Sequence, residues 1–305
     1  MFLRQTRRTF SAVTAGALLF GAFPAAAKNV NTASPQEDAE LAVAQRAIAD
    51  LESKNGGRLG VYVRDTGSGR QIRYHANELF AMCSTHKFLT TAAILSMVDK
   101  GKLQLNQPVY YTQADILSYA PITKAHVQQG FMTIADLCAA AIEWSDNTAA
   151  NLLLKLVGGP AGWTRFARSL GDHVSRLDRI EPSLNEAAPG DPRDTTTPSA
   201  MAEDLNTVLL GSVLTPSSRQ LLEGWMLDNQ ITNSLLRAGM PKGWRVADKS
   251  GSGENGTRND IGLILPPAPH LPIIATVFYT DSPQDAAGRD ALIAQVGQII
   301  AATFS

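Results

Sequence analysis

The distribution of strand-forming and helix-forming segments along the chain is the feature that most constrains its fold. Residues 58–77 alternate in polarity on both sides of a Gly-Ser-Gly turn and predict a β-hairpin. Three further strand-like runs, at 243–253, 259–267 and 271–280, come only near the other end of the chain. The simplest assembly is therefore one antiparallel sheet to which both ends contribute.

Helix signals accompany the strands at both ends. Residues 34–55 start with a serine cap and a proline in the first turn, carry one apolar stripe and stop at a glycine. Residues 282–304 predict a closing helix whose apolar residues also lie on one face. We expect these two helices to flank the sheet.

The middle of the chain is predicted to be mostly helical. Residues 145–159 and 199–214 each begin with a cap-type residue and continue with apolar periodicity. We therefore expect an α/β domain built from residues 28–75 and 236–305, with an all-α domain inserted at residues 76–235. The active site would lie in the cleft between the two.

Residues 177–195 interrupt the helical pattern. The segment is rich in proline, aspartate, asparagine and threonine and has no periodicity. It is too long to be only a connection, because loops of this length in compact domains are usually functional or disordered. We expect a packed, Ω-like loop.

The first 27 residues have the features of an export signal. A basic start with Arg7 and Arg8 precedes a modest apolar run and a small-residue end at 25–27. Paired arginines are typical of the twin-arginine route, so we expect export by that machinery, cleavage near Ala27 and a periplasmic location. No later stretch reaches about 18 unbroken apolar residues, and no cysteine lies near the cleavage site, so no membrane anchor is expected.

Composition excludes several other functions. The 27 basic and 28 acidic residues are nearly balanced and form no basic stripe, so nucleic acid is not an expected partner. The five histidines form no zinc-ligand spacing, and we expect no metal and no cofactor. Cys83 and Cys138 could pair in an exported protein or stay free and buried, and the sequence leaves both open. A monomer is the default expectation.

Ser84 and Lys87 stand three residues apart at the start of an apolar stretch. In a helix they share one face, one turn apart. A partly desolvated amine has a lowered pKa and can take the proton of a neighbouring hydroxyl. The same residue types suit an ordinary helix start, so this pair alone does not distinguish a reactive centre from a cap.

Three further short motifs follow along the chain. They are Ser145-Asp146-Asn147, the segment from Glu181 to Asn185, and Lys249-Ser250-Gly251. Each has an ordinary explanation when taken alone: the first as a helix cap, the second as a turn in a solvated loop, the third as a chance triplet. Their joint order is far more informative than any one of them.

In this order, and in a chain with an export signal, the motifs resemble those of the class A serine β-lactamases, a branch of the penicillin-binding and DD-peptidase superfamily. The resemblance covers nearly the whole chain after the export signal. It implies hydrolysis of β-lactam antibiotics through an acyl-enzyme, and so antibiotic resistance. Ser250 departs from the family's usual threonine but keeps the hydroxyl.

The resemblance also implies catalytic roles. Ser84 is the nucleophile, and either Lys87 or Glu181, acting through a water, removes its proton. Ser145 passes a proton to the departing lactam nitrogen. Glu181 and Asn185 hold the water that releases the acyl group.

A wider set of residues is implied in binding and loop structure. Backbone N–H groups of Ser84 and Ser252 form the oxyanion hole, and Arg179 pairs with Asp194 to close the loop. The implied substrate-binding residues are Asn147, Lys249, Ser250, Gly251, Ser252, Arg258 and Tyr119.

Two rival functions share part of this pattern. A DD-peptidase would use the same serine and lysines but normally lacks a loop that carries a residue like Glu181. A non-catalytic sensor that stays acylated by β-lactams usually adjoins a membrane segment or signalling region. The loop with Glu181 favours hydrolysis over the first rival, and the second is not expected because the sequence shows neither a membrane segment nor a signalling region.

Finer expectations concern the substrates. Ser252 indicates penicillins together with early or oxyimino cephalosporins. Gly253 stands where carbapenem-hydrolysing relatives carry a cysteine bridged to the one before the nucleophile, which disfavours strong carbapenemase activity. Arg258 implies sensitivity to clavulanate-type inhibitors.

Overall fold

The structure is a computed structural model that describes residues 35–305. Contacts join the described residues into one compact unit. The predicted signal peptide, its paired arginines and its cleavage near Ala27 lie outside the described residues.

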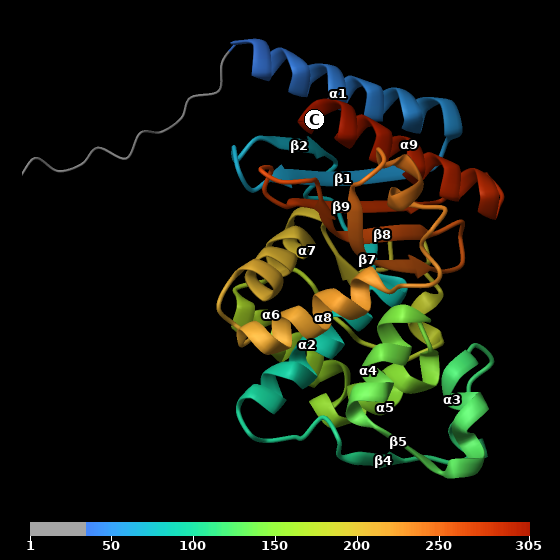
Figure 1. The fold of residues 1–305 in the computed structure, drawn as a ribbon. Coiled ribbons are helices and arrows are strands. Elements are labelled where there is room, and N and C mark those ends of the chain that lie inside the picture. Colours follow the sequence, from blue (N-terminus) through green and yellow to red (C-terminus); the bar gives the residue numbers. More distant parts are fainter. Residues whose placement is uncertain (1–34) are drawn as a thin grey trace, which may run out of the picture. The chain divides into compact units, whose positions relative to one another are not determined.

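One antiparallel sheet is formed by five of the strands within residues 35–305, in the order β2-β1-β9-β8-β7. The first two strands along the chain pair as the predicted hairpin, and β1 pairs along its whole length with β9 from the other end. The prediction that both ends build one sheet is thus confirmed (Figure 1). The strands are β1 (Arg58–Asp65), β2 (Gln71–Tyr74), β7 (Arg245–Ser252), β8 (Arg258–Leu265) and β9 (Ile273–Thr280).

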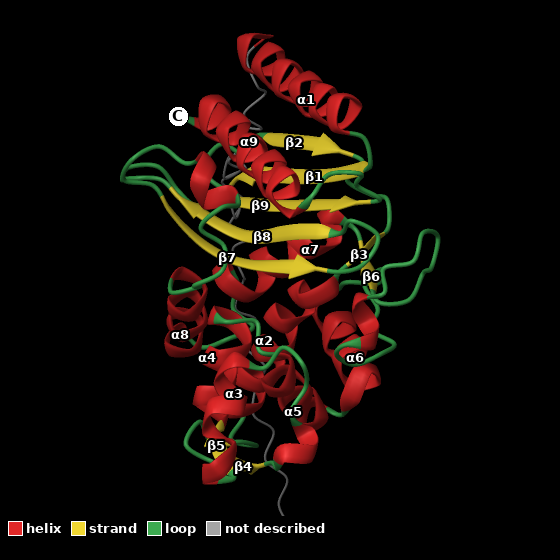
Figure 2. Cartoon of the chain, turned by 90° about the vertical axis from the view of Figure 1, so that its right-hand side faces the viewer, coloured by secondary structure: helices red, strands yellow, loops and turns green. Residues whose placement is uncertain are grey.

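Two long helices cover one face of the sheet. They are α1 (Pro35–Asn55) and α9 (Ala286–Phe304), and both views place them together on the side away from the other helices (Figures 1 and 2). Ile48 of α1 and Val296 of α9 are fully buried against Val61 of β1. The apolar stripes predicted for these helices are therefore what attaches them to the sheet.

The helices of the middle segment lie on the other face. At their centre is α2 (His86–Asp99), which is buried from its first residue to Ser96. A helix that is buried all round has to satisfy its polar side chains internally, which applies to the His-Lys pair at its start. Around it lie α4 (Ile134–Glu143), α5 (Asn147–Val157), α6 (Gly159–Leu170), α7 (Pro198–Leu205) and α8 (Pro216–Leu227).

Short elements in this region are absent from the sequence prediction. A two-residue ladder joins β3 (Phe80–Ala81) to β6 (Thr195–Thr196), and a three-residue ladder joins β4 (Pro108–Tyr110) to β5 (Phe131–Thr133). Strands this short leave no periodicity to detect. The first ladder matters for function, because it fixes the end of the Ω-like loop beside the segment that leads to Ser84.

Other differences from the prediction are small. The helix expected over 199–214 ends at Leu205 and continues as a π-helical turn over Asn206–Leu210. A short helix, α3 (Pro121–His126), precedes β5. Among residues 35–305, no helix is long and apolar enough to cross a membrane.

Candidate active site

Ser84 lies at the junction between the sheet and the helical region. It occupies a 3-10 turn, Cys83–Thr85, that leads directly into α2, so it stands just before the α-helix rather than inside its first turn. One turn later, the Nζ of Lys87 donates a hydrogen bond of 2.9 Å to its Oγ. The spacing that predicted a shared face thus brings the amine and the hydroxyl into contact.

Lys87 is completely buried and surrounded by oxygens. Its Nζ lies 2.8 Å from the carbonyl oxygen of Ser145, 2.6 Å from Oδ1 of Asn147 and 3.0 Å from Oε1 of Glu181. Burial lowers the pKa of Lys87, and the Glu181 carboxylate partly opposes this effect. The amine is therefore closer to losing its proton than an exposed lysine, which suits an exchange with Ser84.

Ser145 connects the two buried lysines. Its Oγ lies 3.2 Å from Nζ of Lys87 and 3.0 Å from Nζ of Lys249. The residue has a positive φ of 56°, a conformation that is uncommon without glycine and is often found at functional sites. Asp146 holds this turn in place, because its carboxylate caps α5 through the backbone N–H of Ala149 and also accepts from the backbone and hydroxyl of Thr123.

The loop over residues 177–195 places the carboxylate of Glu181 beside Ser84 and Lys87. Oε1 accepts a 3.1 Å hydrogen bond from Ser84 Oγ, and the side-chain amide of Asn185 donates to Oε2. Asn151 on α5 fixes the backbone of Glu181 through two hydrogen bonds, of 3.0 and 2.9 Å. Burial alone would raise the pKa of Glu181, but Lys87 and the neighbouring His86 outweigh it and hold that pKa well below its usual range. The carboxylate is therefore ionised and within reach of the serine.

The loop that carries Glu181 is closed by a buried ion pair. Arg179 Nε lies 2.6 Å from Oδ2 of Asp194, and the other carboxylate oxygen accepts the backbone N–H groups of Asp178 and Arg179. Asp194 is fully buried, whereas the Arg179 side chain is 16% exposed. The Asp194 carbonyl in turn accepts from the backbone N–H of Met82, two residues before Ser84.

Replacing Arg179 with serine is expected to loosen this loop. The change leaves a buried carboxylate without its cation, a loss that costs about 3–5 kcal/mol in buried pairs, and the partial exposure of Arg179 favours the low end. Amide hydrogen exchange over 177–195 should then speed up by about a hundredfold. Arg176→Ser is the matched control, because it removes only an exposed pair with Asp178, and such pairs contribute less than about 1 kcal/mol. Unchanged protection in Arg179→Ser would contradict this role.

The end of β7 forms the opposite wall. Lys249 is fully buried, and its Nζ donates to the carbonyl of Ser250 at 2.7 Å. Burial and the cation of Lys87 lower the pKa of Lys249 well below its usual range. A side chain at Gly251 would place its Cβ only 2.7 Å from the carbonyl oxygen of Met82, so glycine allows β7 to pack against the turn that holds Ser84.

Arg258 at the start of β8 faces the end of β7. It pairs across the ladder with Ser252, and its Nη1 donates to the Ser252 hydroxyl at 2.7 Å. Its Nε lies 2.7 Å from Oδ1 of Asp290 on α9. The orientation of this arginine is therefore set from both sides, by the strand and by the last helix.

An open cleft of about 380 Å³ lies over these residues. Eight of the nine lining residues are among those that the sequence pattern singled out; the ninth, Ile231, has no signal in the sequence. Glu181 and the two lysines form the floor behind the lining. The lining consists of Ser84, Tyr119, Ser145, Asn147, Asn185, Ile231, Ser250, Ser252 and Arg258.

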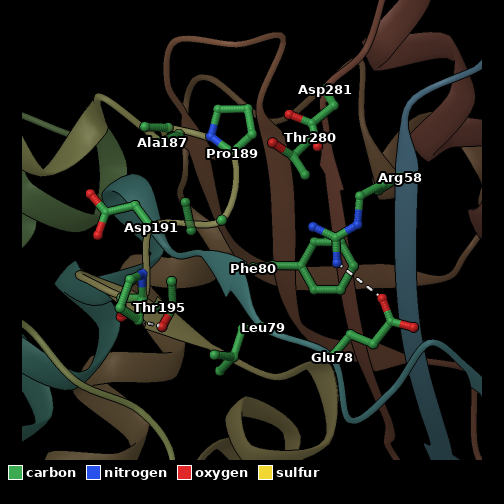
Figure 3. A pocket seen from close by; sticks show the side chains of 14 residues that line it. Arg58, Glu78, Leu79, Phe80, Ala187, Pro189, Asp191, Thr195, Thr280 and Asp281 are labelled. Atoms are coloured by element: carbon green, nitrogen blue, oxygen red, sulfur yellow. Dashed lines mark hydrogen bonds and ion pairs between the residues drawn. The ribbon is translucent and has the colours of Figure 1, made fainter.

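Size alone does not identify the site. A hollow of about 440 Å³ lies behind the loop, where Figure 3 shows Pro189 and Asp191 of the loop on one side and Phe80 and Arg58 on the other. Its one drawn ion pair joins Arg58 to Glu78, and Arg58 also stacks over the Phe80 ring. That hollow has no nucleophile in contact with a base, so the chemistry belongs to the smaller cleft. Residues 35–305 contain no group of three or more His, Cys, Asp or Glu that could hold a metal ion.

Sequence reasoning missed three residues that shape the cleft from behind. They are His86, which contacts Glu181, Asn151, which holds its backbone, and Asp290, which orients Arg258. His86 lies inside the Ser84–Lys87 motif and could have been examined there. The other two are ordinary helix residues whose partners are distant in the chain.

Comparison with known proteins assigns the chain and its fold to a family. Residues 43–304 match the model of the β-lactamase enzyme family. The chain belongs to this family. Its solved relatives place it in class A: an ancestral Gram-negative class A β-lactamase is 54% identical, with a TM-score of 0.84, and the match covers 86% of this chain and 100% of that one.

Curated relatives agree with this assignment. The β-lactamase of Streptomyces albus G is 42% identical over 99% of this chain and 98% of its own length. The β-lactamase Toho-1 of Escherichia coli is 46% identical over 85% of this chain and 89% of its own length. The match to a class A β-lactamase thus extends over nearly all of the described chain.

Both cysteines of this β-lactamase are free and fully buried. Of the two possibilities that the sequence left open, the structure has the unbridged one. Burial raises the pKa of both thiols, so they are unreactive at neutral pH. A Cβ at position 253 would lie only 2.6 Å from Sγ of Cys83, so the thiol fits there only because residue 253 is glycine.

Proposed function

We propose that this class A β-lactamase hydrolyses the lactam amide of penicillins and cephalosporins in two steps and so confers resistance to them. The observation that carries the proposal is the contact of one serine with two groups of opposite charge. Ser84 Oγ lies 2.9 Å from the Lys87 amine and 3.1 Å from the Glu181 carboxylate. An activated nucleophile beside a second base can be acylated and then freed again.

In the first step, Ser84 Oγ attacks the lactam carbonyl. Its proton passes to Lys87, whose amine lies 2.9 Å from the hydroxyl, or through a water to Glu181. The oxyanion is stabilised by the backbone N–H groups of Ser84 and Ser252. The C–N bond then breaks, and the Ser145 hydroxyl, which lies between the two lysines, delivers its proton to the departing nitrogen and takes a replacement from Lys87 at 3.2 Å.

In the second step, water releases the acyl group. Glu181 takes a proton from a water that its carboxylate and the Asn185 amide position, and the hydroxide attacks the ester carbonyl. The ester bond to Ser84 breaks, and the serine recovers its proton. The lowered pKa of Glu181 keeps the base ionised over a wide pH range.

Binding uses the walls of the cleft. Lys249, Ser250 and Arg258 supply cationic and hydroxyl donors for the carboxylate that these drugs share, with Gly251 allowing the close approach of β7. Asn147 offers its amide to the substrate side chain. Tyr119 is 46% exposed at the rim, where an aromatic ring can form a wall for the ligand.

Several finer statements belong to this proposal. We expect early or oxyimino cephalosporins as substrates because of Ser252, weak carbapenem hydrolysis because of Gly253, and sensitivity to clavulanate-type inhibitors because of Arg258. The protein acts as a monomer in the periplasm after twin-arginine export. The division into an α/β domain (28–75 and 236–305) and an inserted helical domain (76–235) is likewise proposed.

Turnover of a chromogenic cephalosporin tests the function. A catalytic amount of the purified protein should hydrolyse many equivalents of the drug at a constant rate. If the protein instead consumes one equivalent of drug and hydrolysis then stops, the proposal is wrong. The protein would then be a DD-peptidase or a drug sensor, because both remain acylated.

A further inference from the structure

A buried histidine contacts the carboxylate that the proposed reaction uses as a base. His86 is the first residue of α2, between Thr85 and Lys87, and is completely buried. Its Nε2 lies 3.4 Å from Oε1 of Glu181, and its Nδ1 lies 3.2 Å from Oγ1 of Thr90, one turn along the helix. The imidazole thus bridges the helix and the loop behind the cleft.

We propose that His86 is a positioning residue for Glu181, holding Oε1 of the carboxylate through its Nε2–H while the acyl group is released. The inference rests on the proposed function, because it assigns a role within deacylation. His86 does not touch the substrate or the reacting atoms and acts only through Glu181.

The tautomer follows from the partners of the ring. An ionised carboxylate only accepts hydrogen bonds, so the nitrogen that faces Glu181 has to carry the proton. Nδ1 is then an acceptor, and the Thr90 hydroxyl is the group that faces it. This hydroxyl also lies 3.1 Å from the carbonyl oxygen of His86, which accepts from the indole N–H of Trp163 at 3.0 Å as well, so its single proton is shared between that carbonyl and Nδ1. The carboxylate of Glu181 selects the tautomer, and the Thr90 hydroxyl supports it when its proton points to Nδ1.

Burial keeps the ring of His86 neutral. The charged groups that face it are Glu181 from the loop, Lys87 from α2 and Lys249 from β7, while α6 contributes the neutral indole of Trp163. Burial lowers the pKa of His86, the two lysines lower it further, and Glu181 opposes them. A neutral imidazole donates its one proton to Glu181 without adding a third cation to the cleft floor.

Acylation makes this contact more important. In the free enzyme, Oε1 of Glu181 is close to three donors: Ser84 Oγ, Lys87 Nζ and His86 Nε2. Once Ser84 is an ester, its oxygen has no proton to donate. Lys87 and His86 then remain as the donors that fix Oε1, and Lys87 is also needed for proton transfer. His86, unlike Lys87, takes no part in proton transfer, so its hydrogen bond to Oε1 can persist throughout deacylation.

The pH profile gives the direction of the effect. A donor to Glu181 stabilises its anionic form and lowers its pKa. Without the donor the pKa of Glu181 rises, so the base is lost at a higher pH and the acid limb of deacylation moves upward. Because Lys87 and His86 both contact the Glu181 carboxylate, at 3.0 and 3.4 Å, this limb belongs to the three groups as a whole.

The test compares two replacements of His86. His86→Phe keeps the size and removes the donor, whereas the amide of His86→Gln can occupy the place of Nε2 and still donate. Acylation and deacylation rates are measured separately by rapid-quench mass spectrometry across the acid pH range. In His86→Phe, deacylation should fall about tenfold, the low end for loss of a hydrogen bond to a charged group because the 3.4 Å contact is long, and its acid limb should rise by up to about one pH unit. His86→Gln should restore most of both, and acylation should change less.

A second pair of variants leaves the histidine in place. Thr90→Val removes the hydroxyl that faces Nδ1 of His86 and should move the acid limb in the same direction by a smaller amount. Thr91→Val is the matched control, because this neighbouring threonine is equally buried and its hydroxyl has no hydrogen-bond partner among residues 35–305. It should leave the profile unchanged.

The outcomes separate this inference from the function beneath it. A wild-type protein without turnover would overturn the proposed function. Normal wild-type turnover, together with wild-type deacylation and an unmoved acid limb in His86→Phe, would overturn only the role of His86. If His86→Phe does not fold, Thr90→Val decides: a shift of its acid limb that Thr91→Val lacks supports the role, and no shift refutes it.

Discussion

Replacing Glu181 with glutamine is expected to leave Ser84 able to form the acyl adduct but unable to release it. The amide has nearly the shape of the carboxylate, and its oxygen can still accept from the side-chain amide of Asn185, while Asn151 continues to hold the backbone N–H of residue 181. It cannot take a proton from water, and loss of a general base typically slows a step by about 10²- to 10⁴-fold. Lys87 still adjoins Ser84 at 2.9 Å, so acylation has a remaining base.

Intact-protein mass spectrometry measures this outcome. After mixing with a penicillin, the Glu181→Gln protein should carry one drug-sized adduct on Ser84 that persists for minutes or longer, whereas the wild type should show none. Glu203→Gln is a suitable control, because Glu203 forms only an exposed pair with Arg64 on a different part of the surface. Prompt loss of the adduct in Glu181→Gln would remove this residue as the deacylating base.

Replacing Ser84 with alanine is expected to abolish hydrolysis and adduct formation together. No other hydroxyl in the cleft contacts both an amine and a carboxylate as Ser84 does. Loss of the nucleophile in serine hydrolases costs on the order of 10⁶-fold in kcat. The change removes one oxygen from a largely buried position, so the fold should tolerate it.

Three measurements on Ser84→Ala belong together: the hydrolysis rate, the protein mass after exposure to drug, and drug binding at equilibrium. Binding should persist, because Lys249 and Arg258 are untouched, while the other two signals vanish. Ser183→Ala, an exposed serine in the loop that carries Glu181, should behave as wild type. Substantial turnover by Ser84→Ala would mean that another group is the nucleophile.

The sequence predicts the sheet and its flanking helices well because these elements are long and periodic. The polarity alternation of 58–77 and the apolar stripe of 34–55 each extend over enough residues to define a face. The ladder of β3 with β6 spans two residues, and the π-helical turn after α7 spans five, so neither can produce a period. These elements exist because tertiary contacts favour them, which a local pattern does not record.

The site residues also fall into those that the sequence predicts and those that only the structure reveals. Ser84 with Lys87, and Ser145 with Asn147, are close in sequence and could be found as motifs. The prediction that these motifs come together in space depended on the family resemblance. The sequence alone does not indicate it, because the bond from Lys249 to Ser145 joins residues 104 positions apart. His86 lies inside a recognised motif, yet the sequence gives no sign of its role. Its partner Glu181 belongs to a loop 95 residues further along the chain, and only the structure shows their contact.

The hydroxyl of Ser145 has a mechanical consequence. It touches one amine anchored in the central helix and another anchored in the edge strand, so the route of the proton crosses the seam between the two halves of the fold. A change that moves the sheet away from the helical region, even far from the cleft, would interrupt this proton transfer before it separated Ser84 from Glu181. Acylation would then be slow while deacylation stayed normal. That kinetic pattern differs from the one expected when the loop that carries Glu181 is disturbed, in which deacylation is slow.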